Sequence, residues 1–149
     1  MAVHLRLKSQ LAELARLAEE ITQLGSEHHL PDEVICHLKL VMEEVVSNIN
    51  RHGYGGREDG EVSVVLHLAP DAIAVTVEDA GVPFNPLDLP APDLTAPLEA
   101  RAVGGLGVYL VRQLMDGVDY REEGGRNILR LTKRIAPRGS RPGAAGTDK

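Results

Sequence analysis

Residues 41–56, VMEEVVSNINRHGYGG, read as the last turns of a long helix that runs into a glycine-rich exit. Apolar residues recur there at intervals of three and four on one side. Glu44, Asn48 and His52 recur at intervals of four on another side. Helix positions four apart differ by about 40° around the axis, so Glu44 and Asn48 can point into one cavity. Two interpretations of these three residues are open: a solvated polar row on the helix surface, or a site that holds a cation and an activated hydroxyl.

The residues before this stretch predict one strand and two helices. Residues 3–7 alternate apolar and polar, which suits a short strand, and from Ser9 the period changes to that of an amphipathic helix ending near Gly25. Pro31, followed by two acidic residues, opens the next helix, which we expect to run from about residue 32 to about 52. Cys36 is the only cysteine, which excludes an internal disulfide, and it is most simply a buried small residue.

The residues after it predict two hairpins around a third helix. Residues 61–68 and 72–79 form the first hairpin, which places Asp79 at a strand end. Residues 85–103 are rich in proline and resist both helix and strand. A helix resumes from Leu106, and residues 118–122 and 127–135 form the second hairpin.

This element order predicts an α+β fold, a two-layer sandwich with helices on one face of a mixed, mostly antiparallel sheet. We expect residues 1–135 to form a single domain. Residues 136–149 are rich in glycine, proline and alanine and are expected to be a disordered tail.

Composition narrows the classes of partner. The chain has 149 residues and a net charge of −6, with no cluster of basic residues, no Trp, one Phe and three Tyr. We therefore do not expect broad electrostatic binding to nucleic acid, and we do not expect aromatic platforms on which bases stack. The chain also lacks an apolar run long enough to cross a bilayer and a secretory leader, so we expect a cytoplasmic protein that binds a small molecule or another protein.

Each polar motif is weak when taken alone. Glu44 with Asn48 is more often a solvent-facing pair, and Asp79 could be an ordinary turn residue. The glycine run at residues 104–107, GGLG, could be a flexible connection or could let backbone amides at a helix start approach an anion. It does not fit a Rossmann fingerprint, and no glycine run is followed by the GK[ST] of a P-loop.

Three segments in this order resemble the Bergerat-fold (GHKL) ATP-binding domain of DNA gyrase, MutL and histidine kinases. EEVVSNINRHGYG (43–55) looks like its N-box, VEDAGVPFNP (77–86) like its first glycine box and GGLGVYLVRQLMDGVDY (104–120) like its second. The resemblance covers roughly residues 8–134. Within this superfamily the chain looks most like the anti-sigma-factor serine-protein kinases of the RsbW and SpoIIAB type.

The resemblance implies a role for four residues. Asn48 matches the amide that ligates Mg²⁺ between the phosphates, and Glu44 matches the carboxylate that orients or deprotonates an acceptor hydroxyl. Asp79 matches the acceptor for the exocyclic amine of adenine. Gly81 matches the glycine that leaves room for the base.

It also implies a set of residues on the phosphate side. The glycines of the second box would let the loop close over the phosphates, with nearby backbone amides facing them: Gly104, Gly105, Leu106, Gly107 and Val108. Arg101, Arg51 and His52 are further candidates for phosphate contacts, and a capping or surface role for the last two is equally open. The closing-strand threonine of the superfamily is not evident. Arg126 and Asn127 stand there instead, which leaves the phosphate-side hydrogen bonding of this strand open.

The function implied is that of an ATP-dependent serine/threonine protein kinase that regulates transcription by partner switching. It would bind ATP or ADP with Mg²⁺, hold a sigma factor in one state and phosphorylate a small antagonist (anti-anti-sigma) protein in another. A homodimer is expected, without direct binding to nucleic acid or membrane. The alternative from another class is a non-catalytic ATP/ADP-binding module that sequesters a protein partner.

Overall fold

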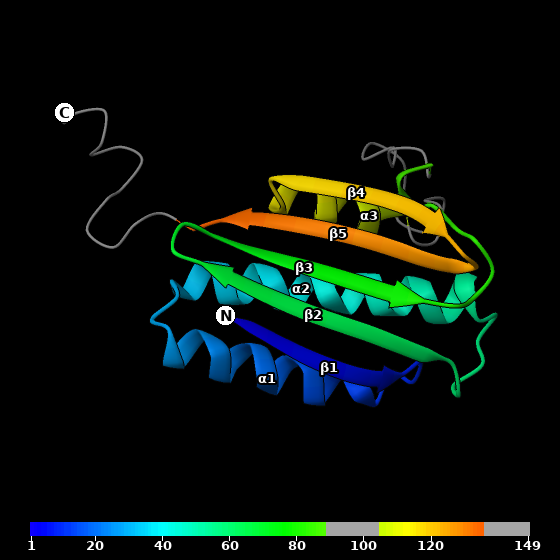
Figure 1. Cartoon of the computed structure of the whole chain (residues 1–149), viewed down its shortest axis with the longest axis horizontal. Coiled ribbons are helices and arrows are strands. Elements are labelled where there is room, and N and C mark those ends of the chain that lie inside the picture. Colours follow the sequence, from blue (N-terminus) through cyan, green and yellow to red (C-terminus); the bar gives the residue numbers. More distant parts are fainter. Residues whose placement is uncertain (89–104, 136–149) are drawn as a thin grey trace.

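The computed structural model describes residues 1–88 and 105–135 (Figure 1). The elements in chain order are β1 (Ala2–Lys8), α1 (Glu13–Glu27), α2 (Asp32–Asn48), the π-helical turn η1 (Ile49–Gly53), β2 (Glu61–Ala69), β3 (Ala72–Asp79), the 3₁₀ turn η2 (Pro86–Asp88), α3 (Gly105–Leu114), β4 (Gly117–Glu123) and β5 (Arg126–Arg134). The expected tail from residue 136 lies outside the described residues. Within the described ranges, no helix has the length and apolar character needed to cross a membrane.

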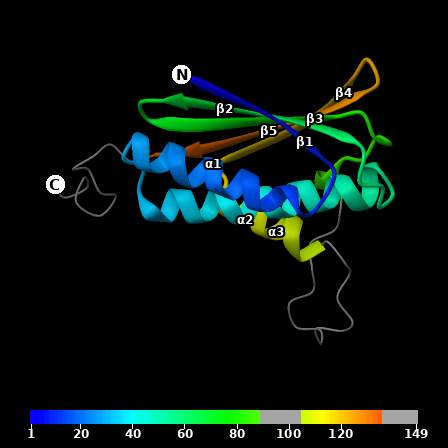
Figure 2. The same cartoon turned by 90° about the horizontal axis from the view of Figure 1, so that it is seen from below.

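The five strands form one sheet in the order β1-β2-β3-β5-β4. The helices α1, α2 and α3 lie on the same face of this sheet, as Figure 2 shows. The expected α+β sandwich is confirmed. The sheet differs from the expected mixed sheet, because each of its four pairings is antiparallel. Two of the pairings are hairpins, and the other two, β1 with β2 and β3 with β5, also join strands that run in opposite directions.

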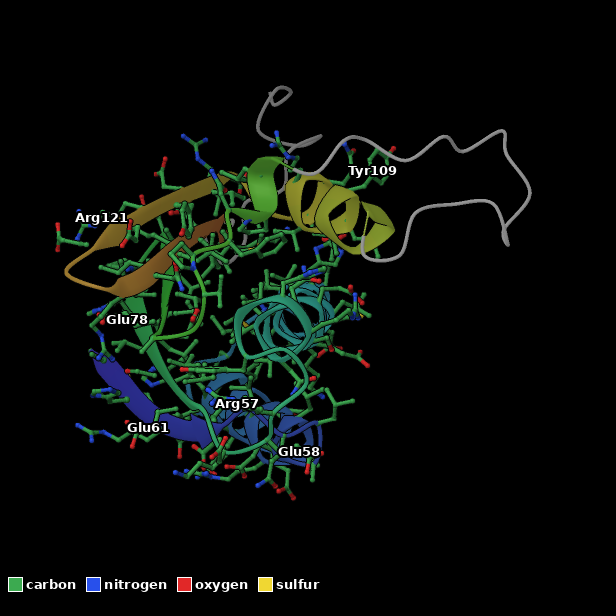
Figure 3. The ribbon with its side chains drawn as sticks, turned by 90° about the vertical axis from the view of Figure 1, so that its right-hand side faces the viewer. Arg57, Glu58, Glu61, Glu78, Tyr109 and Arg121 are labelled. Carbon is green, nitrogen blue, oxygen red and sulfur yellow. The ribbon has the colours of Figure 1, made fainter. Side chains whose placement is uncertain are left out.

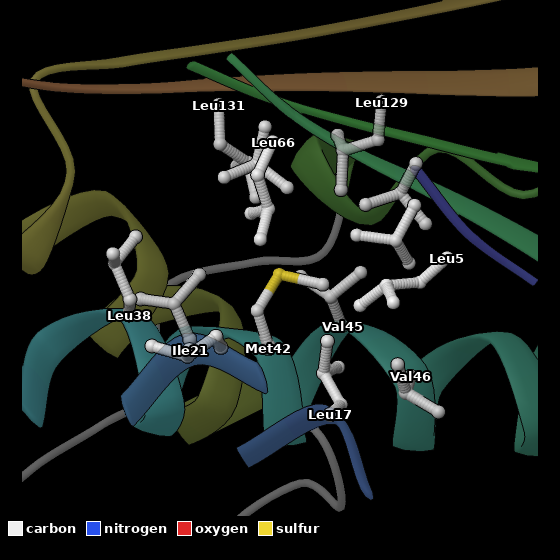
Figure 4. Close-up of a cluster of buried hydrophobic side chains, with 14 of the residues drawn as sticks. Leu5, Leu17, Ile21, Leu38, Met42, Val45, Val46, Leu66, Leu129 and Leu131 are labelled. Carbon is white, nitrogen blue, oxygen red and sulfur yellow. The ribbon is translucent and has the colours of Figure 1, made fainter. Parts of the chain in front are cut away.

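The core fills the space between the helices and the inner face of the sheet. Leu17 and Ile21 of α1 meet Leu38, Met42 and Val46 of α2 there, below the sheet residues Leu66 and Leu131 (Figure 4). Burying a side chain of this size contributes roughly 1.5–3 kcal/mol. This packing fixes α2 against the sheet, so that the end of α2 lies beside the end of β3.

The outer face of the sheet carries charged side chains instead. Glu78 and Arg121 project away from the helices in Figure 3. Arg126 Nε donates to Glu78 Oε1 at 3.0 Å, in an ion pair that stays open to solvent. Such exposed pairs contribute at most about 1 kcal/mol, so the alternation of inward apolar and outward polar residues decides the sheet's orientation.

Two helix boundaries differ from the expectation, each for a packing reason. The helix expected from Ser9 begins at Glu13, because Ser9 is fully buried and its hydroxyl donates to the carbonyl of Arg57 at 2.6 Å. Gly25 lies inside α1, where an added Cβ would come within 2.4 Å of Ile35. This glycine therefore allows close packing of α1 on α2. Cys36, expected to be buried, is exposed on α2.

Candidate functional site

A pocket opens between the end of α2, the loop after β3 and the inner face of β4 and β5. Its walls are mainly apolar and include Val45, Ile49, Val111, Val118 and Leu129. Four polar side chains also line it: Asn48, Asp79, Tyr120 and Asn127. An apolar slot with a few convergent polar groups suits a flat ligand held by specific hydrogen bonds.

Asp79 is the buried acceptor of this pocket. Its side chain is 4% exposed, and its Oδ1 atom accepts hydrogen bonds from the backbone N–H of Gly81 and from Asn127 Nδ2, each at 2.9 Å. Within the described residues, no hydrogen bond reaches the other carboxylate oxygen, Oδ2. The carboxylate is thus held on one side, and Oδ2 remains an acceptor for a donor on a ligand.

The loop after Asp79 is attached to the end of η1, the turn that follows α2. The N–H of Val82 donates to the carbonyl of Gly53 at 2.7 Å, and the N–H of Ala80 donates to the Tyr54 hydroxyl at 2.9 Å. Because the Gly81 N–H is also bonded, three consecutive amides of this loop are satisfied within the protein. The loop therefore supports the Asp79 end of the pocket and does not offer these amides to an anion.

The end of α2 carries buried polar atoms that lack partners. Asn48 is 5% exposed, and within the described residues neither its Oδ1 atom nor His52 Nε2 has a hydrogen bond. A buried polar group without a partner is unfavourable for folding, so its presence favours a role in binding. An amide oxygen suits Mg²⁺, which keeps several waters and takes few protein ligands. The described ranges hold no cluster of three His, Cys, Asp or Glu residues that could bind a metal.

The neighbours of Asn48 lie in different environments. Glu44 is half-buried one turn earlier on α2, and it is not among the residues that line the pocket. The His52 ring stacks on Phe84, with centroids 4.4 Å apart and an interplanar angle of 23°. Arg51 is exposed. The structure thus brings Asn48 and Asp79 to one pocket, with Glu44 and His52 one turn to either side of Asn48.

The second glycine box forms the start of α3. Gly105, Leu106, Gly107 and Val108 occupy its first turns, and α3 lies beside α2 on the helical side of the sheet (Figure 2). A helix start presents N–H groups without intrahelical partners, and such groups can face an anion. Arg101 and Gly104 lie outside the described residues.

Two pocket residues were missed as site residues by the sequence interpretation. Asn127 stands directly opposite Asp79 in the β3–β5 register, and its amide donates to that carboxylate. The Tyr120 hydroxyl donates to Asn127 Oδ1 at 2.6 Å. In the sequence, Asn127 was noticed only because it stands where the superfamily has threonine. Its position opposite Asp79 follows from the strand register, which no local motif reveals.

Comparisons with known proteins agree with this geometry. A family model described as the histidine kinase-like ATPase domain matches residues 7–133. The serine-protein kinase RsbW of Listeria innocua is 30% identical over 139 residues, which are 91% of this chain and 87% of that protein. The serine-protein kinase RsbW of Bacillus mycoides is 35% identical over 103 residues, which are 66% of this chain and 62% of that protein.

Two solved structures share the fold. The RsbU and RsbW domains of a Mycobacterium tuberculosis protein match with a TM-score of 0.65 at 17% identity, over 91% of this chain and 32% of that one. The blue-light activated histidine kinase of Erythrobacter litoralis matches with a TM-score of 0.54 at 21% identity, over 83% of this chain and 41% of that one. This chain therefore spans well under half of either solved chain.

Proposed function

Because the chain belongs to the histidine kinase-like ATPase family, and within it to the serine-protein kinases of the RsbW type, we propose that it transfers the γ-phosphate of ATP to a hydroxyl of a partner protein. One observation supports this most directly. The buried acceptor Asp79 and the unpartnered amide oxygen of Asn48 line the same pocket, between the end of α2 and the loop after β3. Those are the two chemical groups needed to hold a base and a phosphate-bound cation.

Asp79 would bind the base. Its free Oδ2 atom would accept a hydrogen bond from the exocyclic amine of adenine, with the ring between apolar walls such as Val45 and Leu129. Gly81 would support the site indirectly, because an added Cβ at this position would lie 2.4 Å from the Gly53 carbonyl oxygen and would displace the loop that carries Asp79. Guanine carries an oxygen where adenine has this amine, so the same carboxylate would disfavour it.

Asn48 would ligate Mg²⁺ through Oδ1, and the bound ion would neutralise charge on the phosphates. Glu44 would accept the proton of the acceptor hydroxyl. As that proton leaves, the hydroxyl oxygen bonds to the γ-phosphorus, the bond from the γ-phosphorus to the bridging oxygen breaks, and ADP departs with the electron pair. Aligning these atoms supplies most of the catalysis in phosphoryl transfer, and the base adds about 10²–10⁴-fold.

The phosphates would lie against the start of α3. Backbone amides of Gly105, Leu106, Gly107 and Val108 would face them, as N–H groups at a helix start face anions. His52, whose buried Nε2 atom has no hydrogen bond within the described residues, would lie on the same side of the proposed site. Arg101, Gly104 and the exposed Arg51 complete the proposed phosphate contacts.

The proposed partners are a sigma factor and a small antagonist protein that carries the acceptor hydroxyl. The protein would act as an anti-sigma factor in the cytoplasm and as a homodimer, with residues 1–135 of each subunit forming a single domain. Light scattering on the purified protein tests the dimer. Pull-down assays between this protein and each sigma factor encoded by the source genome, with and without ATP, test the switching of partners.

The central experiment is a transfer assay with radiolabelled Mg-ATP. The purified chain is incubated with each antagonist-domain protein and each sigma factor of the source genome, and the label on serine or threonine is mapped. We expect one antagonist-domain protein to be labelled by the parent chain and not by an Asp79→Asn variant. If the chain binds ATP but labels none of these proteins, the non-catalytic binding module is the better description.

A further inference from the structure

We propose that Asn127 and Tyr120 are positioning residues that fix Asp79, so that the pocket discriminates between bases by their 6-substituent. This inference rests on the proposed nucleotide site. It concerns Asn127, one of the two residues at which the chain departs from the threonine pattern of the superfamily, and Tyr120, which contacts it.

The three side chains lie on the inner face of three adjacent strands, β3, β5 and β4. Asp79 and Asn127 are direct cross-strand partners, with 4% and 5% of their surfaces exposed. Asn127 Nδ2 donates to Asp79 Oδ1 at 2.9 Å and to the carbonyl of Gly81 at 3.2 Å. Both hydrogens of this amide are therefore used to hold the turn that carries Asp79.

The orientation of the Asn127 amide follows from its partners. Asp79 Oδ1 and the Gly81 carbonyl are both acceptors, so the Nδ2 end must face them. The Asn127 Oδ1 end then faces Tyr120, whose hydroxyl donates to it at 2.6 Å. A flipped amide would place two acceptors against each other at Asp79. Tyr120 thus stabilises the one orientation that supplies Asp79 with a donor.

This arrangement separates the two oxygens of the Asp79 carboxylate. Oδ1 is occupied by two donors, the Gly81 N–H and Asn127 Nδ2, while Oδ2 is left for the ligand. A carboxylate held in this way cannot rotate to relieve a mismatch. A 6-amino group gains a hydrogen bond with Oδ2, and a 6-oxo group meets an acceptor that has no hydrogen to give. Selectivity therefore depends on Asn127 and Tyr120 as well as on Asp79.

The test compares the affinities of three nucleotides by calorimetry: ATP, ITP with a 6-oxo group, and purine riboside triphosphate with no 6-substituent. We expect the parent protein to bind ATP about 10- to 100-fold more tightly than purine riboside triphosphate, the range for a hydrogen bond to a charged group. Asn127→Asp replaces the amide by a carboxylate of the same size, so that Asp79 loses the amide donor and gains a neighbour that repels its charge. We expect this variant to bring the ratio close to one. Tyr120→Phe removes only the hydroxyl, and we expect the ratio to fall several-fold.

A matched control is Gln113→Glu, which changes an amide to a carboxylate on the exposed side of α3. We expect it to leave the ratio unchanged. If Asn127→Asp fails to fold, Tyr120→Phe carries the test, because it keeps the aromatic ring in the pocket wall. If Asn127 and Tyr120 had a purely structural role, their substitution would weaken the binding of all three nucleotides equally. An unchanged ratio of affinities between ATP and purine riboside triphosphate in the folded variants would therefore overturn the inference.

The affinities of the parent protein distinguish a failure of this inference from a failure of the proposed nucleotide site on which it rests. Equal affinity of the parent chain for all three nucleotides would overturn the Asp79 site itself, and with it the inference. If the parent protein discriminates between the nucleotides and both variants do so equally well, the nucleotide site is supported. Only the role of Asn127 and Tyr120 is then overturned.

Discussion

Gly81 and Gly53 meet backbone to backbone: a Cβ atom added to Gly81 would lie 2.4 Å from the Gly53 carbonyl oxygen. The same oxygen accepts the N–H of Val82 at 2.7 Å. The loop after β3 and the end of η1 therefore share one contact, in which no side chain fits. Because Asp79 precedes this loop and Asn48 precedes Gly53 by little more than one turn, the contact fixes the distance between the two ends of the proposed site.

Gly81→Ala should therefore weaken nucleotide binding through backbone displacement. The clash involves backbone atoms, which cannot turn aside as a flexible side chain can, so the loop and Asp79 must move. We expect at least a tenfold loss of ATP affinity and a destabilisation of about 1–3 kcal/mol, the usual range for overpacking. Calorimetric titration and urea unfolding measure the two effects.

Gly117→Ala is the control for this change. A Cβ atom at Gly117 would lie 3.5 Å from the nearest atom, Thr132 Cβ, at ordinary van der Waals distance. This variant should keep parental affinity and stability within about 0.5 kcal/mol. Parental ATP affinity in Gly81→Ala would show that the contact with Gly53 does not set the geometry of the pocket.

Tyr54 holds the same loop from the other side. Its buried hydroxyl donates to the Glu61 carbonyl at 2.7 Å and accepts the Ala80 N–H at 2.9 Å. Tyr54→Phe leaves both backbone groups without this partner, so we expect a loss of about 1–3 kcal/mol in the free energy of unfolding. The control is Tyr109→Phe, at a half-buried position on α3 whose hydroxyl makes no hydrogen bond within the described residues. Equal stability of the two variants would contradict the bracing role.

Much of this architecture follows from periodicity in the sequence. The helix expected over residues 32–52 appears as α2 and η1, and the two hairpins lie where alternation and turn residues predicted them. The π-helical form of η1 was not predictable, since apolar periodicity indicates a helix but not the spacing of its hydrogen bonds. Exposure of Cys36 was missed for a similar reason: residue type suggests burial, but the position of the residue on α2 decides it.

The candidate site divides in the same way. Asn48 and Asp79 belong to local motifs, and the expectation that they lie near each other agrees with the pocket that both line. Asn127 and Tyr120 act through cross-strand neighbours, and strand register is a property of the whole sheet. Residues that hold a motif residue in place are therefore harder to find in a sequence than the motif residue itself.

Asn48 should show a conflict between stability and binding. Its buried Oδ1 atom has no partner in the described residues, so an apolar side chain of similar volume removes an unfavourable group. We expect Asn48→Leu to unfold at equal or higher temperature than the parent and to lose the increase in ATP affinity produced by Mg²⁺. Titrations with Mg²⁺ and with a chelator measure this increase. A variant that keeps the full Mg²⁺ effect would exclude Asn48 as the ligand.

Glu44 tests the chemical step separately from binding. It lies one turn before Asn48, half-buried and outside the pocket lining, so its removal should leave nucleotide affinity nearly unchanged. We expect Glu44→Gln to bind Mg-ATP within about threefold of the parent and to transfer phosphate about 10²–10⁴-fold more slowly, the range for loss of a general base. Single-turnover transfer to the labelled antagonist-domain protein measures this rate.

The neighbouring residue provides the matched control, because Glu43→Gln makes the same chemical change at an exposed position on the same helix. Removing the exposed charge should alter neither binding nor transfer by more than about twofold, as expected for a surface substitution. Two results would count against a base at residue 44. The first is parental transfer by Glu44→Gln, and the second is an equal slowing by both variants, which would indicate an effect of helix charge on partner docking. A slow Glu44→Gln beside a parental Glu43→Gln assigns the effect to the position of the carboxylate next to Asn48.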